Sequence, residues 1–192
     1  MMRGHRSIQM HVNNVAVAVL LLAAAAARSS ADVTPAAGDA FVVKQTAVVP
    51  CAPLEAFDAF TGDITPWWDH SFSATPYRMY IEPKPGGGFV ELFDAAGNGA
   101  LHATVITVRR GKLIRFDGPL GLAGSAVLNI TTCTFDSAGG DSCRVTVEAH
   151  MSGEVDQQLA SIVDGVWRHF LVERFAPYMR SGAFRSKKPL KH

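Results

Sequence analysis

The chain has 192 residues, of which 48% are hydrophobic and 18% are charged. This length and composition are typical of one globular domain with a sizeable core, and they exclude a disordered chain. The first 31 and the last ten positions hold seven of the 18 basic residues and no acidic residue, so the chain between them has 11 basic against 17 acidic side chains. We therefore expect no nucleic-acid partner, because an acidic body repels a phosphate backbone.

Residues 1–31 have the layout of a cleaved secretory signal peptide. A basic start at Arg3, His5 and Arg6 precedes an uninterrupted apolar run over residues 15–27, and small residues follow. The run is shorter than the roughly 20 residues that a membrane-spanning helix needs. We expect a secreted or periplasmic protein without a stable membrane span after cleavage; the alternative is a retained amino-terminal anchor.

The first structural elements are predicted after a linker at residues 32–40. Residues 41–49 are rich in β-branched side chains and predict a strand. Pro53 suits the first position of a helix that continues over residues 54–61. Asp63 is placed to cap a second short helix, which carries the Trp67-Trp68 pair.

The middle of the chain predicts strands separated by glycine- and proline-rich turns. The short connections require antiparallel neighbours, because a parallel return needs a crossover helix. The six strands expected here cover residues 78–82, 88–93, 100–108, 113–117, 126–135 and 142–151.

A long helix is predicted over residues 155–179, where apolar residues recur at intervals of three and four. Pro177 is expected to kink or end it, because proline lacks the amide donor. The basic segment 183–192 is predicted to be a flexible tail.

The order of elements predicts an α+β fold. A curved seven-stranded antiparallel sheet must bury one face, and only the last helix is long enough to cover it. One helix covers only part of a wide sheet. Side chains fill the remainder, or a cavity remains there, closed by the two short helices between strands 1 and 2.

Five local patterns lie in a fixed order within residues 41–180. They are VPCAPLEAF at 49–57, Trp67-Trp68, EPKPGGGFVE at 82–91, GPLG at 118–121 and DGVW at 164–167. Together they resemble the SRPBCC superfamily, which includes the START and birch-pollen-allergen folds. The most similar branch is the one named after the activator of heat-shock-protein-90 ATPase.

The resemblance implies a helix-grip domain over residues 41–182, built around a hydrophobic cavity. Members of the superfamily include lipid and hormone carriers, cyclases and dioxygenase subunits, so the resemblance carries no shared catalytic residues. The predicted export argues against a co-chaperone role, because it separates the chain from the cytosolic chaperone. Pro177 departs from the family pattern near the end of the long helix.

Glu91 and His102 are the candidate catalytic pair. A tight turn over residues 95–98 places Glu91 opposite His102, and opposed residues share a sheet face. Glu91 alternates with Phe89, so both face the cavity if Phe89 does. A carboxylate beside an imidazole in an apolar cavity can act as acid or base. The alternatives are a structural ion pair and a solvated pair.

Eight residues are candidates for contact with a small-molecule ligand. Most are aromatic, and each of them is alternatively a core residue. Asn129 shares a face with Thr131, and these polar groups can instead bond to each other. The candidates are Trp67, Trp68, Phe72, Phe89, Phe116, Asn129, Trp167 and Phe170.

Cys133 and Cys143 flank a predicted turn centred on Ala138, which places them opposite each other. An oxidising compartment permits a cross-strand disulfide between them, and the alternative is two buried thiols. Cys51 has no partner in sequence. Metal binding is not expected, because the cysteines lack histidines at ligand spacing and His70, His150 and His169 are scattered.

Three functions remain open. We favour extracytoplasmic binding of an apolar or aromatic small molecule, without a cofactor. The second is a cofactor-free cyclase or dehydratase that uses Glu91 and His102. The third is a protein-interaction module with the Trp67-Trp68 loop as an exposed anchor. The sequence does not indicate an oligomeric state.

Overall fold

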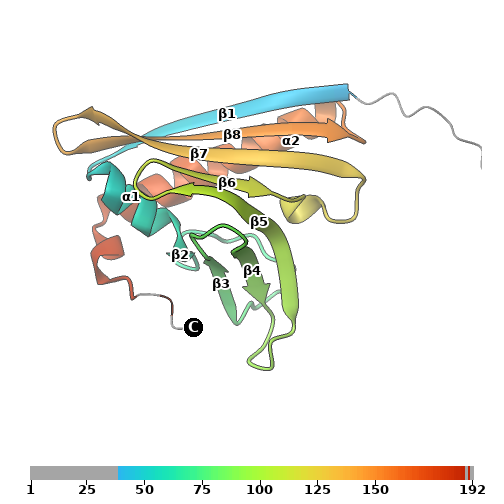
Figure 1. Ribbon diagram of the computed structural model, residues 1–192, viewed down its shortest axis with the longest axis horizontal. Coiled ribbons are helices and arrows are strands. Elements are labelled where there is room, and N and C mark those ends of the chain that lie inside the picture. The colour runs from blue at the N-terminus through green and yellow to red at the C-terminus, as the bar shows by residue number, and fades with distance from the viewer. Residues whose placement is uncertain (1–38, 189, 191–192) are drawn as a thin grey trace, which may run out of the picture. The chain divides into compact units, whose positions relative to one another are not determined.

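One antiparallel sheet, gripped by a carboxy-terminal helix, forms the framework of the described residues (Figure 1). The computed structural model describes residues 39–188 and residue 190, so the predicted signal peptide lies outside it. The described sheet has eight strands in the order β1-β8-β7-β6-β5-β4-β3-β2. The strands are β1 (Asp39–Val49), β2 (Gly62–Asp63), β3 (Arg78–Ile81), β4 (Gly88–Leu92), β5 (Gly99–Arg109), β6 (Leu113–Asp117), β7 (Val127–Gly139) and β8 (Ser142–Gly153).

The expected count of seven strands is wrong by one. The additional strand is β2, which pairs Gly62 with Ile81 and Asp63 with Tyr80 at the edge of the sheet. Two residues are too few to show a period in the sequence. Strand β1 begins at Asp39, so the last two residues of the predicted linker belong to the sheet.

Helix α1 (Pro53–Phe60) forms where the sequence predicts it. Pro53 stands in its first turn, and the Glu55 carboxylate accepts a 3.1 Å hydrogen bond from the Ala52 amide. These features stabilise a helix start because the first amides of a helix have no partner within it. Ala56, Phe57 and Phe60 on its inner face are buried.

The predicted second short helix is wrong, because its segment makes a single turn. The Thr65 amide donates to Asp63 Oδ1 at 3.0 Å, so Asp63 does cap this turn. The amides of Trp67 and Trp68 both donate to the Ile64 carbonyl. The chain then leaves the turn, and the Trp68 indole donates to the His70 carbonyl at 2.8 Å. One turn gives too few hydrogen bonds to propagate a helix.

The carboxy-terminal helix is continuous from Gln157 to Arg180, in three parts. These are α2 (Gln157–Arg168), a π-helical segment (His169–Phe175) and α3 (Ala176–Arg180). A helix end at Pro177 is therefore wrong. The Ala176 amide donates to the Leu171 carbonyl, five residues back. The wider π turns give room for the proline ring, which in a regular helix crowds the carbonyl four residues earlier.

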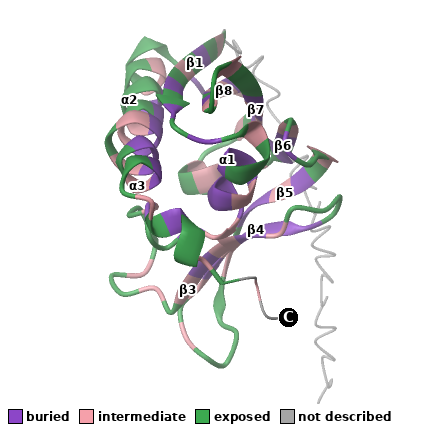
Figure 2. Cartoon of the chain, turned by 90° about the vertical axis from the view of Figure 1, so that its left-hand side faces the viewer, coloured by how far each residue is buried: buried purple, intermediate pink, exposed green. Residues whose placement is uncertain are grey.

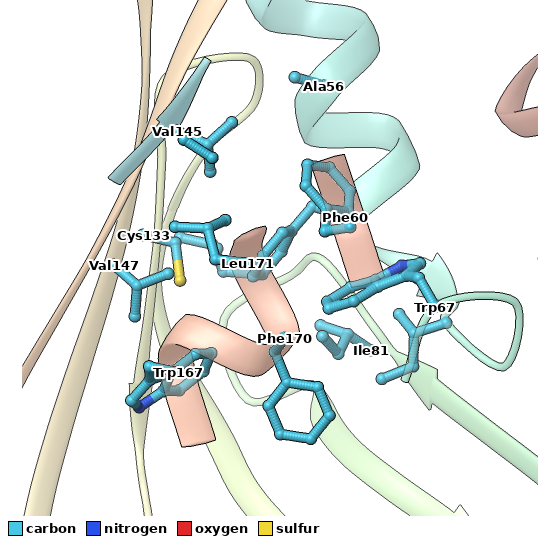
Figure 3. Close-up of a cluster of buried hydrophobic side chains, with 14 of the residues drawn as sticks. Ala56, Phe60, Trp67, Ile81, Cys133, Val145, Val147, Trp167, Phe170 and Leu171 are labelled. Atoms are coloured by element: carbon cyan, nitrogen blue, oxygen red, sulfur yellow. The ribbon is translucent and has the colours of Figure 1, made fainter. Parts of the chain in front are cut away.

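The helix presents a buried side to the sheet and an exposed side to solvent (Figure 2). Near α1, aromatic rings fill the space between helix and sheet. Phe60 lies with its ring centroid 5.3 Å from Phe175 and 5.6 Å from Phe135, and Trp67 lies 5.0 Å from Phe175. Trp167 and Phe170 project from the helix farther along the same core (Figure 3). One end of the concavity is thus packed with side chains.

The β7–β8 hairpin turns later than predicted. Cys143 pairs with Ser137, and Cys133 pairs with Val147, so the two cysteines are not opposite each other. Gly139 and Gly140 both have positive φ, and the turn therefore forms there rather than at Ala138. The predicted disulfide is absent: Cys51, Cys133 and Cys143 are free, buried thiols.

The prediction of a flexible tail is wrong for the residues described after position 182. Ala183–Ser186 forms a 3-10 helix in which Phe184 is buried. Lys187 Nζ donates to the carbonyls of Asp58, Ala59 and Thr61. An ammonium group at the carboxyl end of α1 satisfies carbonyls that have no partner within that helix. No helix in the described part of the chain is long and apolar enough to cross a membrane.

Candidate functional site

A cavity of about 330 Å³ lies between the carboxy-terminal helix and the concave face of the sheet. Its walls come from the segment that starts at Trp68, from β5, β7 and β8, from the loop before β7 and from the carboxy-terminal helix. Most of the lining is apolar or aromatic. The lining residues are Trp68, His70, Ser71, Phe72, His102, Pro119, Leu120, Gly121, Leu122, Asn129, Met151, Ile162, Val163, Val166, Trp167 and Phe170.

Five of the eight predicted ligand-contact residues line this cavity. They are Trp68, Phe72, Asn129, Trp167 and Phe170. The other three, Trp67, Phe89 and Phe116, are buried in the packed core instead. Alternation along a strand predicts which residues lie on the buried face of the sheet. It does not distinguish residues of the packed core from residues of the cavity wall.

Aromatic stacking builds one wall. The Trp68 indole stacks on the Phe170 ring with centroids 3.6 Å apart and planes 7° apart. Phe89 and Trp167 contact the same indole edge to face, at 4.9 and 6.0 Å. Such pairs contribute about 0.5–1.5 kcal/mol each beyond the burial of their area. The wall is therefore formed before any ligand arrives.

This packing overturns the prediction of an exposed tryptophan anchor. Only 1% of Trp67 is exposed, and Trp68 is half-buried by its stack on Phe170. The two indoles are held edge to face at 5.6 Å. They belong to the core and the cavity wall, so they are not an exposed binding surface.

Glu91 and His102 are in contact, although not by the predicted pairing. Glu91 pairs with Ala100 across the β4–β5 ladder, and a bulge leaves His102 without an opposite residue. The bulge turns both His102 and Ala103 inward. His102 Nε2 lies 2.9 Å from Glu91 Oε2, and both side chains are buried. The predicted pair is real, but only His102 reaches the cavity lining.

The Glu91 carboxylate is held by three donors. Besides His102, it accepts hydrogen bonds from the amides of Phe72 at 2.9 Å and Ser73 at 2.8 Å. Burial raises the pKa of a carboxyl group, but these hydrogen bonds outweigh burial and lower the pKa of Glu91 below 4.5. Glu91 is therefore ionised at neutral pH. It ties the segment that carries Phe72 to the sheet.

This arrangement fixes the orientation of the His102 ring. An ionised carboxylate only accepts, so Nε2 of His102 carries the proton of their hydrogen bond. The other ring nitrogen, Nδ1, has no hydrogen-bond partner among the residues that the structure describes, and His102 lines the cavity. The imidazole therefore offers one polar atom to whatever enters.

Asn129 contributes less polarity than its position suggests. Its amide Nδ2 donates to the Gly118 carbonyl at 3.0 Å, and its Oδ1 accepts from the Thr131 hydroxyl at 3.2 Å. These polar groups therefore serve each other and the backbone. A side chain at Gly118 would come within 2.6 Å of the Ala103 backbone, so the close approach of this loop to β5 requires glycine.

Several cavity residues were missed at the sequence level. Leu120 and Leu122 belong to a 3-10 turn (Leu120–Leu122) inside a segment that sequence patterns mark only as a turn. Leu120 has φ = 53°, which is rare for a residue with a branched side chain. Such strained positions concentrate at functional sites. The GPLG motif marks this loop, but it gives no indication of a cavity.

Two histidines that are scattered in the sequence lie together at the rim of the cavity. The rings of His70 and His169 stack at 5.4 Å, and both contact Phe170. His169 Nε2 lies 2.9 Å from Asp69 Oδ1, and Nδ1 lies 3.3 Å from Glu173 Oε2. The hydrogen bond to Asp69 is the main reason that the pKa of His169 is raised, and Glu173 adds to the effect.

A second hollow, of about 770 Å³, lies between α1 and the carboxy-terminal segment. It is larger, but more than half of its lining residues are charged, among them Asp58, Glu82, Lys84 and Arg110. An apolar ligand gains little from such a surface, because its binding depends on water being excluded. We therefore assign the candidate site to the smaller cavity.

Comparison with known proteins identifies the fold. No family model matches the sequence, and no curated protein matches it. Among solved structures, SA2116 from Staphylococcus aureus, a protein of unknown function, has a TM-score of 0.55 at 9% identity over 77% of this chain and 98% of that one. The Aha1 dimer from Colwellia psychrerythraea has a TM-score of 0.53 at 14% identity over 74% and 98% of the two chains.

An uncharacterised protein from Rhizobium leguminosarum is similar as well, with a TM-score of 0.52 at 13% identity over 77% of this chain and 99% of that one. At such identities the similarity concerns the fold alone. The chain therefore has the helix-grip fold of SRPBCC proteins, as its sequence resemblance predicted.

Proposed function

We propose that this protein binds a small apolar or aromatic molecule in the cavity between its sheet and its carboxy-terminal helix. The observation that carries the proposal is an aromatic-walled cavity in which a buried carboxylate holds one imidazole against the lining. Sites for small molecules are mostly apolar, with a few placed polar groups that fix orientation.

The volume limits the size of the ligand. Pockets for small molecules span roughly 300–1,000 Å³, and this cavity of about 330 Å³ stands near the lower end. One or two fused rings suit such a volume, whereas a long lipid chain does not.

His102 restricts the chemistry of the ligand. Its Nδ1 meets one polar group of the ligand, and a hydroxyl group is suitable because it donates as well as accepts. A hydrogen bond in an apolar cavity contributes about 0.5–1.5 kcal/mol, which corresponds to a preference between about twofold and about tenfold. The proposed ligand is therefore an aromatic molecule with a hydroxyl at one end.

Calorimetric titration with 2-naphthol and naphthalene tests this proposal. The wild type is expected to bind 2-naphthol about two- to tenfold more tightly than naphthalene. His102→Phe is expected to lose the preference for 2-naphthol and to retain naphthalene binding. The control is His150→Phe, at an exposed histidine on β8, which is expected to keep the preference. The proposal fails if neither compound binds, or if His102→Phe leaves the preference unchanged.

The location of the protein is part of the proposal. Residues 1–31 support export through their basic start and short apolar run. Mass spectrometry of the chain recovered from the extracytoplasmic fraction should give a mass that lacks the leader. Recovery of the uncleaved chain from the cytosol would refute export.

A cofactor-free enzyme is the second candidate, and the Glu91–His102 contact favours it. An ionised carboxylate that orients an imidazole makes the imidazole a more effective proton acceptor. Glu91 does not line the cavity, so it would not contact a substrate. His102 would accept the proton, and Glu91 would hold the His102 ring in position.

Exchange of the acidic carbon-bound protons of 2-tetralone with deuterium, followed by NMR, tests this candidate. The candidate is supported if the wild type exchanges these protons faster than buffer alone, if Glu91→Gln exchanges them more slowly than the wild type, and if His102→Phe exchanges them at the buffer rate. Exchange at the buffer rate in the wild type would exclude proton abstraction from this carbonyl compound and leave binding alone.

A further inference from the structure

Asp69, His70 and His169 converge at the rim of the cavity. Asp69 and His70 stand in the segment after Trp68, and His169 begins the π-helical part of the carboxy-terminal helix. One ligand atom from each residue lies within 4.8 Å of the other two. Two imidazole nitrogens and a carboxylate oxygen are the donor set that Zn²⁺ and neighbouring divalent transition metals prefer.

We propose that these three residues form a binding site for a divalent transition metal of the zinc type. A tetrahedral zinc ion, with bonds of about 2 Å, holds its ligand atoms roughly 3.3 Å apart. His169 Nε2 and Asp69 Oδ1 are already 2.9 Å apart, with a proton between them. A metal ion can replace that proton once the two ligand atoms move a few tenths of an ångström farther apart.

His70 supplies the third ligand after a side-chain rotation. Its ring is stacked nearly parallel to that of His169, with planes 13° apart, so its nitrogens do not yet point at the shared position. His70 is exposed, and an exposed ring changes rotamer at little cost. Three protein ligands leave one coordination position open for water or a ligand group.

Glu173 supports the site from behind. Its Oε2 lies 3.3 Å from Nδ1 of His169, on the side of the ring opposite to Asp69. A carboxylate on the distal nitrogen fixes the orientation of a metal-bound histidine and increases its basicity. This arrangement distinguishes His169 from a surface histidine that merely contacts an acidic neighbour.

Two arginines oppose the metal. Arg174 Nε lies 3.1 Å from Asp69 Oδ2, and Arg168 pairs with Glu173 at 3.1 Å. Arg174 competes with a cation for Asp69, so Arg174→Gln is expected to strengthen metal binding. A metal bound here would connect the segment after Trp68 to the carboxy-terminal helix, next to the cavity wall formed by Phe170.

Titration of the untagged chain with Co²⁺, followed by the visible absorption of the metal, tests the site. One Co²⁺ per chain is expected, displaced by Zn²⁺. His70→Ala and His169→Ala should each abolish the saturable signal, and Glu173→Gln should weaken binding about 10- to 100-fold. Circular dichroism checks that these surface variants remain folded.

His150→Ala is the matched control. His150 also contacts a carboxylate, Glu148, at 2.8 Å, but among the described residues it is not grouped with a second histidine. This variant should bind Co²⁺ like the wild type. The proposal is overturned if the wild type shows no saturable binding, if binding survives in both His70→Ala and His169→Ala, or if His150→Ala removes it. The readout uses the metal alone, so it does not depend on the proposed ligand.

Discussion

The buried Glu91 carboxylate connects three parts of the site. It joins β4, the cavity residue His102 and the backbone of the segment that carries Phe72. A buried charge is tolerated only when hydrogen bonds replace the lost water, and three donors do so here. This one side chain therefore determines both the orientation of the imidazole and the position of part of the cavity wall.

Glu91→Gln is predicted to lower the free energy of unfolding at pH 7 by about 1–3 kcal/mol. The neutral amide accepts fewer of these hydrogen bonds than the carboxylate, and the bonds that remain lack the negative charge of the acceptor. The folded-state pKa of Glu91 lies below 4.5, so its stabilisation is present above that pH and is lost as pH falls through the folded pKa. Urea unfolding of both proteins between pH 7 and pH 3 should show their difference shrinking only in the acid range.

Glu148→Gln is the control for this experiment. Glu148, on β8, makes exposed ion pairs with Lys44 on β1 and with His150 on its own strand, and such pairs contribute little. An effect of Glu148→Gln as large as that of Glu91→Gln, or a difference for Glu91→Gln that does not depend on pH, would contradict the assigned role of the buried carboxylate.

Sequence reasoning placed Glu91 and His102 on one face but gave them the wrong partners. The β4–β5 turn pairs Leu92 with Gly99, where the predicted turn pairs Asp94 with that glycine. The observed register is displaced by two residues, and a displacement by two keeps side chains on the same face. The bulge at His102 could not be predicted from the sequence, because no glycine or proline marks its position.

At the scale of elements, the segment after α3 is attached to the domain by Phe184 and Lys187. Phe184→Ala is predicted to lower the free energy of unfolding by about 1.5–3 kcal/mol, because the ring is buried. Urea denaturation measures this, with Lys188→Ala as an exposed control in the same segment. Equal stability of the two variants would show that the segment is not docked.

The β7–β8 hairpin makes a prediction about thiols. Its register separates Cys133 from Cys143, and burial raises the pKa of Cys51 and of Cys143 to about 11. Titration with a thiol reagent should find three reactive thiols per denatured chain and almost none in the native protein. One reactive thiol after denaturation would contradict the three free thiols of the structure, because it would require a disulfide.

Elements with strong local signals were predicted well, and those determined by long-range packing were not. Helix α1 has a proline at its start and an apolar face, so its position was predicted within one residue. The second short helix failed because Trp67 and Trp68 turn toward the core and stop it after one turn. The basic residues of the final segment suggested a solvated tail, and only the fold shows where Phe184 is buried.

At the scale of the whole molecule, the cavity follows from an unequal fill of the concave sheet. Phe57, Phe60, Trp67, Phe135 and Phe175 fill the end near α1. At the opposite end the aromatic side chains line a cavity of about 330 Å³ instead. The sequence predicted that one helix cannot cover the sheet. It did not indicate which end stays open, because that depends on how the side chains of the helix and of the segment after Trp68 pack against the sheet.

The most direct test of this account fills the cavity from the helix side. Val163 lines the cavity on α2, and Val163→Trp adds volume where the ligand is proposed to lie. Val166→Trp is a second such variant, and Val42→Trp, at an exposed position of β1, is the control.

Calorimetric titration of these folded variants with 2-naphthol is the decisive measurement. The account predicts that both cavity-filling variants lose binding while Val42→Trp binds like the wild type. Binding of 2-naphthol to Val163→Trp and Val166→Trp with wild-type affinity would contradict it.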